Sequence, residues 1–225
     1  DRLIAGQLRW GGGAVARGHA WLLLAGLPSA AVWPRAPVVP VKGSSVDYLY
    51  AWRVNRVFGP DSPQGIWRDT EIHAVRAAYT IKNVGALSAY GYWLDIPSQP
   101  SSSSRILGVR MAGEHPVGGK STFLYAAEYA RQHDHGANPR SFGLDYWLIE
   151  PGVKTGPLTF KAGYERLEGN GTVGLQTPLA TLHAFNGWAD KFLTTPANGL
   201  RDAYLDASYK VPGMGALAGL TLRAA

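Results

Sequence analysis

Charged side chains recur inside short segments that alternate apolar and polar residues. Their spacing could bring them together on one face, where they could interact with ions or polar solutes. In a segment of period two, every second side chain points to the same face of a sheet. Such a face can line a water-filled pore, where charged side chains select ions and polar solutes. It can also brace neighbouring strands by ion pairs, or be the solvated face of a β-sandwich. The candidate pore-lining residues are Arg53, Arg76, Arg110, Glu128, Asp145, Lys161, Glu165, Asp202 and Asp206.

Catalytic and metal-binding patterns are weak by comparison. His133 and His135 flank Asp134, but a solvated loop is a better account of this segment than a metal site. The chain has no cysteine, no G-x-S-x-G nucleophile motif and no glycine-rich phosphate loop. Ser141 lies near His135 in the sequence without an indicated third partner. We therefore predict no catalytic residue, no metal site and no cofactor, and we expect that the protein is not an enzyme.

Nine segments of strand length follow one another from residue 46 onward, each bounded by Gly, Pro, Asn or Ser. They cover residues 46–56, 71–81, 86–96, 105–113, 121–131, 141–150, 156–166, 200–210 and 215–224, and residues 1–10 are a candidate tenth. Compact connections such as 82–85 and 114–120 alternate with longer polar ones such as 97–104. This alternation predicts an all-β fold, an antiparallel up-and-down meander. Residues 11–37 show no sustained period, and we assign them no structure.

Aromatic side chains gather near the ends of these segments, with aliphatic residues and alanine between them. The tyrosines and the tryptophan assigned to this face are Tyr48, Tyr50, Trp52, Tyr79, Tyr90, Tyr92, Tyr125, Tyr129, Tyr146, Tyr164 and Tyr209. Two aromatic girdles around an apolar band are typical of a transmembrane β-barrel. The pattern therefore favours a barrel over a soluble sandwich.

Composition narrows the function classes further. The 225 residues carry a net charge of +6, and most of the basic excess lies in residues 1–45, where five basic residues face one acidic residue. The remainder is close to balanced and has no Lys/Arg run, so we predict no nucleic-acid partner. No apolar run approaches the roughly 20 residues of a transmembrane helix, whereas a transmembrane strand needs only about 10.

Three stretches resemble bacterial outer-membrane proteins of the alginate-export type, a porin-like family. They are "YAWRVNRVFGPDSPQG" (50–65), "YAAEYARQHDHGANP" (125–139) and "GYERLEGNGTVGLQTPLATLHAFNGWADKFLTTPANGL" (163–200). The resemblance covers about residues 38–225. It implies a transmembrane barrel of about 16–18 strands in the Gram-negative outer membrane. We therefore expect residues 1–225 to form one barrel domain that is incomplete.

The resemblance implies a porin or export channel that passes small polar or anionic solutes by passive diffusion. An acidic polysaccharide is the solute that the family name implies, but the balanced charges of the candidate lining do not favour it. The alternative is a closed surface barrel that acts as a receptor, adhesin or structural scaffold. Expected partners are outer-membrane lipid and lipopolysaccharide, and the oligomeric state stays open.

Residues 167–199 form the longest connection, and its apolar residues recur at spacings of three or four. These residues are Leu179, Leu182, Phe185, Trp188 and Phe192. We hypothesise that this loop folds inward as a short helix and constricts the pore. The alternative is an outer cap that rests on neighbouring loops.

Overall fold

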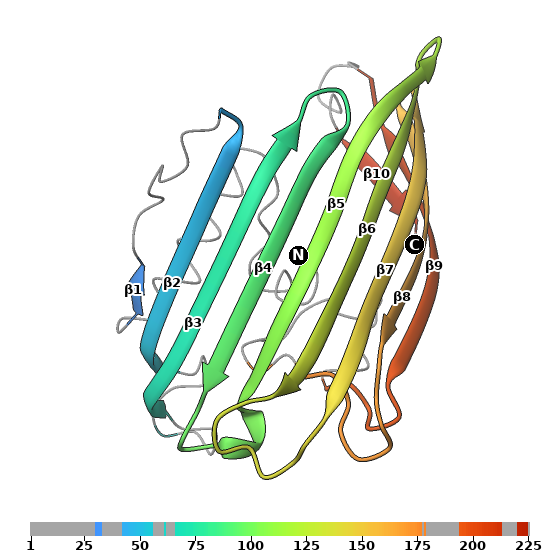
Figure 1. Cartoon of the computed structure of the whole chain (residues 1–225). Coiled ribbons are helices and arrows are strands. Elements are labelled where there is room, and N and C mark those ends of the chain that lie inside the picture. The colour runs from blue at the N-terminus through green and yellow to red at the C-terminus, as the bar shows by residue number, and fades with distance from the viewer. Residues whose placement is uncertain are drawn as a thin grey trace.

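A single curved sheet dominates the computed structural model, which describes residues 30–32, 42–55, 61, 66–176, 178, 194–212 and 220–224. Ten antiparallel strands follow one another in chain order across it, as Figure 1 shows. The strands are β1 (Ala30–Val32), β2 (Ser44–Asn55), β3 (Ile66–Ile81), β4 (Gly85–Asp95), β5 (Ser104–Gly118), β6 (Ser121–Asp134), β7 (Gly143–Thr155), β8 (Leu158–Leu167), β9 (Leu200–Lys210) and β10 (Thr221–Ala224). This order confirms the predicted up-and-down meander.

Every one of the nine predicted strand segments corresponds to a strand, from β2 to β10. β1 lies within residues 11–37, for which the sequence predicted no structure, and the candidate strand 1–10 lies outside the described residues. Helix is limited, in the part of the chain that the structure describes, to the 3-10 turn η1 (Pro100–Ser102). No described helix is long and apolar enough to cross a membrane.

Two strands are longer than predicted because each continues through a proline. The predicted connection 114–120 and the stretch between the predicted strand segments 141–150 and 156–166 are largely strand: β5 includes Pro116, and β7 includes Pro151. The β-ladder between β7 and β8 is interrupted at Glu150 and Pro151 and continues on either side of these two positions. Proline removes only its own N–H from a ladder, so the pairs on either side can hold the strand in register.

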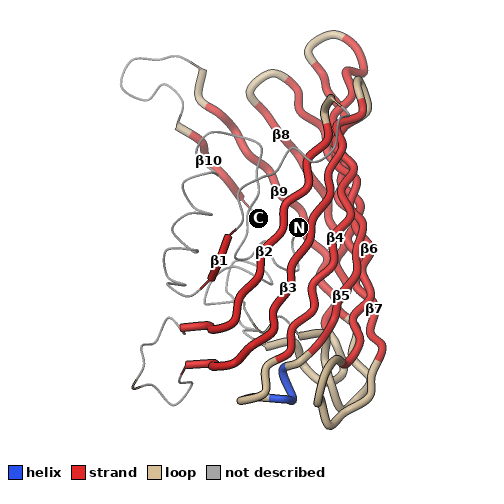
Figure 2. The backbone as a smooth tube through the Cα atoms, turned by 60° about the vertical axis from the view of Figure 1, so that its left-hand side comes forward, coloured by secondary structure: helices blue, strands red, loops and turns tan. Residues whose placement is uncertain are grey.

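The two ends of the sheet differ in their connections. Residues 82–84, 119–120 and 156–157 connect strands at one end, which we call the short-turn end. Residues 56–65, 96–103, 135–142 and 168–199 connect strands at the other, the long-loop end. Figure 2 shows the curvature of the sheet.

Alternation along the strands gives the sheet two unlike faces. The face that carries Glu128, Tyr146 and Glu165, which we call the inner face, holds most of the buried residues. The outer face carries large apolar side chains that are exposed, and Leu205 reaches 76% exposure. Exposed outer-face residues include Leu107, Val109, Phe123, Trp147, Ile149, Val153, Phe160, Tyr164 and Leu222.

Two glycines on the inner face lie directly beneath tyrosine rings of the neighbouring strand. Gly108 of β5 pairs with Tyr90 of β4, and Gly163 of β8 pairs with Tyr204 of β9. A Cβ added at Gly163 would lie 2.0 Å from Cζ of Tyr204, and one at Gly108 would lie 2.3 Å from Cζ of Tyr90. Only glycine leaves room for a ring to lie flat across the strand.

The packing at Gly163 predicts a sharp difference between neighbouring positions. Gly163→Ala should lower the free energy of unfolding by about 1–3 kcal/mol, because overpacking forces the Tyr204 ring from its place. Ala162→Val on the exposed outer face should change stability by less than about 0.5 kcal/mol. Urea unfolding followed by tryptophan fluorescence measures both variants. Equal stability of Gly163→Ala and the unaltered protein would contradict the proposed packing.

Candidate functional site

Seven of the nine candidate pore-lining residues project from the inner face, as strand register and the burial of their neighbours show. They are Arg76, Arg110, Glu128, Lys161, Glu165, Asp202 and Asp206. Four of them stand in one lateral row, because successive strand pairings join Arg110 to Glu128, then through Leu148 to Glu165 and Asp202. The row therefore places three carboxylates and one guanidinium at the same level of the sheet.

Arg53 and Asp145 do not share that face, which corrects the prediction for both. The β2–β3 pairing is irregular between Ala51 and Arg53, so Arg53 faces Arg68 on the outer face while the adjoining Val54 is buried on the inner face. Asp145 lies between Leu144 and Tyr146, whose side chains are fully buried on the inner face. A bulge reverses the alternation in the first case, and the assignment of Tyr146 to the wrong face caused the second error.

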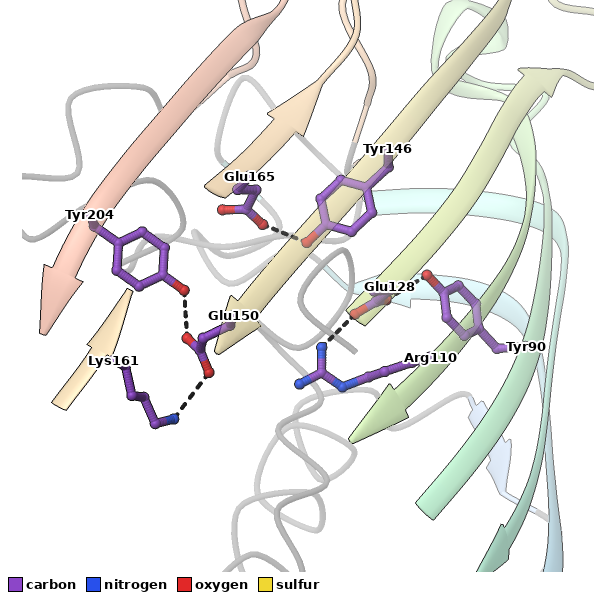
Figure 3. A network of polar contacts seen from close by, with 8 residues as sticks. All are labelled: Tyr90, Arg110, Glu128, Tyr146, Glu150, Lys161, Glu165 and Tyr204. Carbon is purple, nitrogen blue, oxygen red and sulfur yellow. Dashed lines mark hydrogen bonds and ion pairs between the residues drawn. The ribbon is translucent and has the colours of Figure 1, made fainter. Parts of the chain in front are cut away.

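Glu128 is the centre of the first polar cluster of the inner face, which we call the Glu128 cluster (Figure 3). The Tyr90 hydroxyl donates to Oε1 of Glu128 at 2.7 Å, and a guanidinium nitrogen of Arg110 donates to Oε2 at 2.7 Å. Glu128 is only 3% exposed, so its charge depends on these donors. Tyr90 reaches from β4 to β6 because Gly108 of β5 leaves room beneath its ring.

A second cluster, the Glu150 cluster, repeats this arrangement on β7, β8 and β9. The Tyr204 hydroxyl donates to Oε2 of Glu150 at 2.5 Å, and Nζ of Lys161 donates to Oε1 at 3.0 Å. Tyr204 crosses β8 above Gly163, just as Tyr90 crosses β5. In both clusters the cation stands two residues from the glycine, on the strand between the tyrosine and the glutamate (Figure 3).

Four other charged residues of the inner face also meet partners of opposite sign or hydrogen-bond donors. Tyr146 donates to Oε1 of Glu165 at 2.5 Å, and Arg223 of β10 pairs with Asp206. Arg76 and Asp47 approach to 3.7 Å. These contacts support the bracing interpretation of the charges. Within the described ranges, no group of three or more His, Cys, Asp or Glu side chains could hold a metal ion.

Sequence reasoning missed the inner-face tyrosines. Tyr90, Tyr92 and Tyr146 were assigned to the outer aromatic face, but the structure buries all three on the inner face. For Tyr146 the available signal was its parity with a carboxylate of the same strand, whereas Asp95 of β4 has the opposite parity to Tyr90 and Tyr92. Tyr146 lies four residues before Glu150, and Tyr204 lies midway between Asp202 and Asp206. The outer-face assignment agrees with the structure for Tyr48, Tyr79 and Tyr164, which are exposed.

The long connection after β8 begins by turning onto the inner face. The Gln132 side chain of β6 both donates to the carbonyl of Gln176 at 2.8 Å and accepts from its N–H at 2.7 Å. Gln132 and Leu175 are fully buried, so this first part of the loop is packed. The predicted constriction residues Leu179, Leu182, Phe185, Trp188 and Phe192 lie outside the described residues.

An all-β, antiparallel up-and-down sheet of this kind is similar to porin barrels. The crystal structure of Pseudomonas aeruginosa OpdL matches 76% of this chain and 47% of its own length, with a TM-score of 0.56 and 16% identity. That of Acinetobacter baumannii OccAB3 matches 84% of this chain and 48% of its own, with a TM-score of 0.56 and 11% identity. The chain thus spans about half the length of each. No protein-family model and no curated protein sequence matches it significantly, so the alginate-export resemblance stays a prediction.

The Glu128 cluster predicts strong coupling between its two charges. A double-mutant cycle of Arg110→Met and Glu128→Gln should give a coupling free energy of about 1–3 kcal/mol, because either single change removes their ion pair from a largely buried site. The more exposed outer-face pair Arg131–Asp145, at 3.1 Å, should give about 0–1 kcal/mol when changed to Gln and Asn. Urea unfolding of the four variants in each cycle tests this. Coupling no larger in the first cycle than in the second would contradict the assigned role of Glu128.

Proposed function

We propose that this chain forms part of a porin in the Gram-negative outer membrane, a channel for passive diffusion of small polar or anionic solutes. The observation that carries the proposal is the contrast between the two faces of one sheet. Large apolar side chains such as Leu205, Ile149 and Leu222 are exposed on the outer face, whereas carboxylates and guanidinium groups project from the inner face. An apolar wall around a polar interior is the arrangement of a membrane barrel.

The lengths of the strands suit this location. β2 to β9 contain between 10 and 16 residues, and a tilted strand crosses a membrane with about 9–11. An open sheet edge would leave backbone groups without partners in lipid. We therefore infer that further strands of the complete protein close the barrel, as the half-length match to two porin barrels supports.

The lining favours passive passage of polar solutes. Glu128 and Glu150 meet hydrogen-bonding and ionic partners, which supports a wall that stabilises a wet lumen without taking part in a reaction. The lateral row of three carboxylates and Arg110 does not make the lining strongly basic. An acidic polysaccharide, the finer candidate solute, is therefore supported by the sequence resemblance alone.

We infer that the loop 167–199 narrows this lumen. The two hydrogen bonds between Gln132 and Gln176 hold its first part against the inner face. The predicted apolar positions from Leu179 to Phe192 follow directly after this attachment in the sequence. A loop fixed in this way enters the barrel from the long-loop end.

Ion selectivity tests the lining with one change on each face. In planar bilayers, Asp202→Asn should shift the reversal potential of the full protein toward anion preference, because it removes a carboxylate from the charged row. Arg53→Gln on the outer face should leave the reversal potential unchanged. Equal shifts in both variants would contradict the assignment of the faces. A full protein that inserts but never conducts would instead support the closed surface barrel.

Deletion of the loop tests the constriction. Replacing residues 179–193 by a short Gly/Ser linker should raise single-channel conductance, because a wider pore carries more current. A matched shortening of residues 57–64, at the same end of the sheet, should not raise it. Unchanged conductance after the first deletion would favour the outer-cap alternative.

A further inference from the structure

Six arginines form a belt on the outer face at the long-loop end. Each stands at the end or the beginning of a strand next to a long connection, and each alternates with neighbours that face inward. The residues of this arginine belt are Arg53, Arg68, Arg105, Arg131, Arg166 and Arg201. Four of them are exposed and the other two are half-buried. The outer face of the described strands carries no Lys or Arg at the short-turn end, where the lysines of the connections lie in turns.

The belt places like charges directly opposite each other twice. Arg53 of β2 faces Arg68 of β3, and Arg166 of β8 faces Arg201 of β9. Like charges at directly opposed positions of an antiparallel pair are destabilising. An anion that lies between two such guanidinium groups offsets this cost, and arginine binds phosphate with paired hydrogen bonds.

Carboxylates of the same region do not neutralise the belt. Arg131 pairs with Asp145 at 3.1 Å, and Arg166 pairs with Glu168 at 2.9 Å. With Asp69, Glu71 and Asp95 counted as well, six arginines exceed five carboxylates. The belt thus keeps a positive charge on exposed side chains.

Aromatic and apolar surface adjoins the belt on the side toward the middle of the strands. Trp147 pairs with Arg166, is 44% exposed, and packs against Tyr129 with ring centroids 4.4 Å apart. Exposed apolar side chains such as Val109 and Ile149 follow along the same strands. A ligand that suits this surface combines an anionic head with acyl chains, since aromatic residues mark the level of lipid headgroups.

We propose that the arginine belt binds the phosphate groups of anionic lipids in the leaflet at the long-loop end. This inference rests on the proposed membrane location. A lipid phosphate, rather than free phosphate, is the ligand because the arginines border a continuous apolar surface that would contact the acyl chains. The belt then fixes how deeply the sheet lies in the membrane. It also gives the long-loop end a preference for anionic lipids that the short-turn end lacks.

Lipid competition tests the belt directly. The full protein in detergent is given equal amounts of phosphatidylglycerol and phosphatidylcholine, and native mass spectrometry measures the ratio of the two bound lipids. We expect phosphatidylglycerol to be favoured, and we expect Arg166→Gln/Arg201→Gln to reduce the ratio by roughly threefold or more, since each basic residue at a headgroup contributes up to about fivefold. The matched control Lys82→Gln/Lys120→Gln, in turns at the short-turn end, should keep the ratio of the unaltered protein.

Several outcomes would overturn the inference. They are an unaltered protein without preference, a preference that survives the arginine changes, or an equal loss in the lysine control. Inorganic phosphate that abolishes the preference, where chloride of equal ionic strength does not, would assign the belt to free phosphate. Conductance of the same samples separates the two proposals: conducting protein without lipid preference refutes the belt alone, and protein that never inserts into a bilayer refutes the membrane location itself.

Discussion

Strand register is the constraint on which the rest of this structure depends. In a paired strand each side chain faces one side or the other, so a slip of one residue would exchange the faces. The Glu128 cluster shows how narrowly the register is specified: Tyr90 reaches Glu128 only because Gly108 lies between them. A slip would move Glu128 to the apolar face without Arg110, and a buried carboxylate without donors is costly. The polar clusters therefore stabilise the register as well as the wall.

Pattern reasoning could identify the strands because their alternation is local. It located nine strands, and its errors lie at positions where a proline or a bulge interrupts the local pattern. Pro116 and Pro151 indicated turns, but pairs on both sides of each proline continue the ladder. Arg53 was assigned to the wrong face because the irregularity after Ala51 reverses the alternation, and no single-sequence signal marks it. The presence of a strand thus follows from composition and periodicity, whereas the face that each of its side chains takes depends on pairing with a neighbouring strand.

The candidate site was less predictable, because its contacts join strands that are far apart in the sequence. Tyr204 and Glu150 are 54 residues apart, and nothing local shows that Gly163 permits their hydrogen bond. An aromatic residue near a strand end was taken as a girdle residue, although tyrosine can equally extend its hydroxyl to a carboxylate in a polar interior. Parity with carboxylates of the same strand separates the two roles for Tyr204, which shares the phase of Asp206, and for Tyr164, which alternates with the inner-face Glu165.

The two faces differ in how far their opposed charges balance one another. On the inner face, most opposed charges are unlike, as at Arg110 and Glu128 or at Lys161 and Asp206, although Glu165 faces Asp202. On the outer face at the long-loop end, two arginine pairs are directly opposed, Arg53 with Arg68 and Arg166 with Arg201, although Arg131 faces Asp145. A surface that does not balance its own charge needs anions from its surroundings. Since the connection 168–199 starts from this same end, the proposed anionic leaflet would lie on the side from which this connection turns onto the inner face.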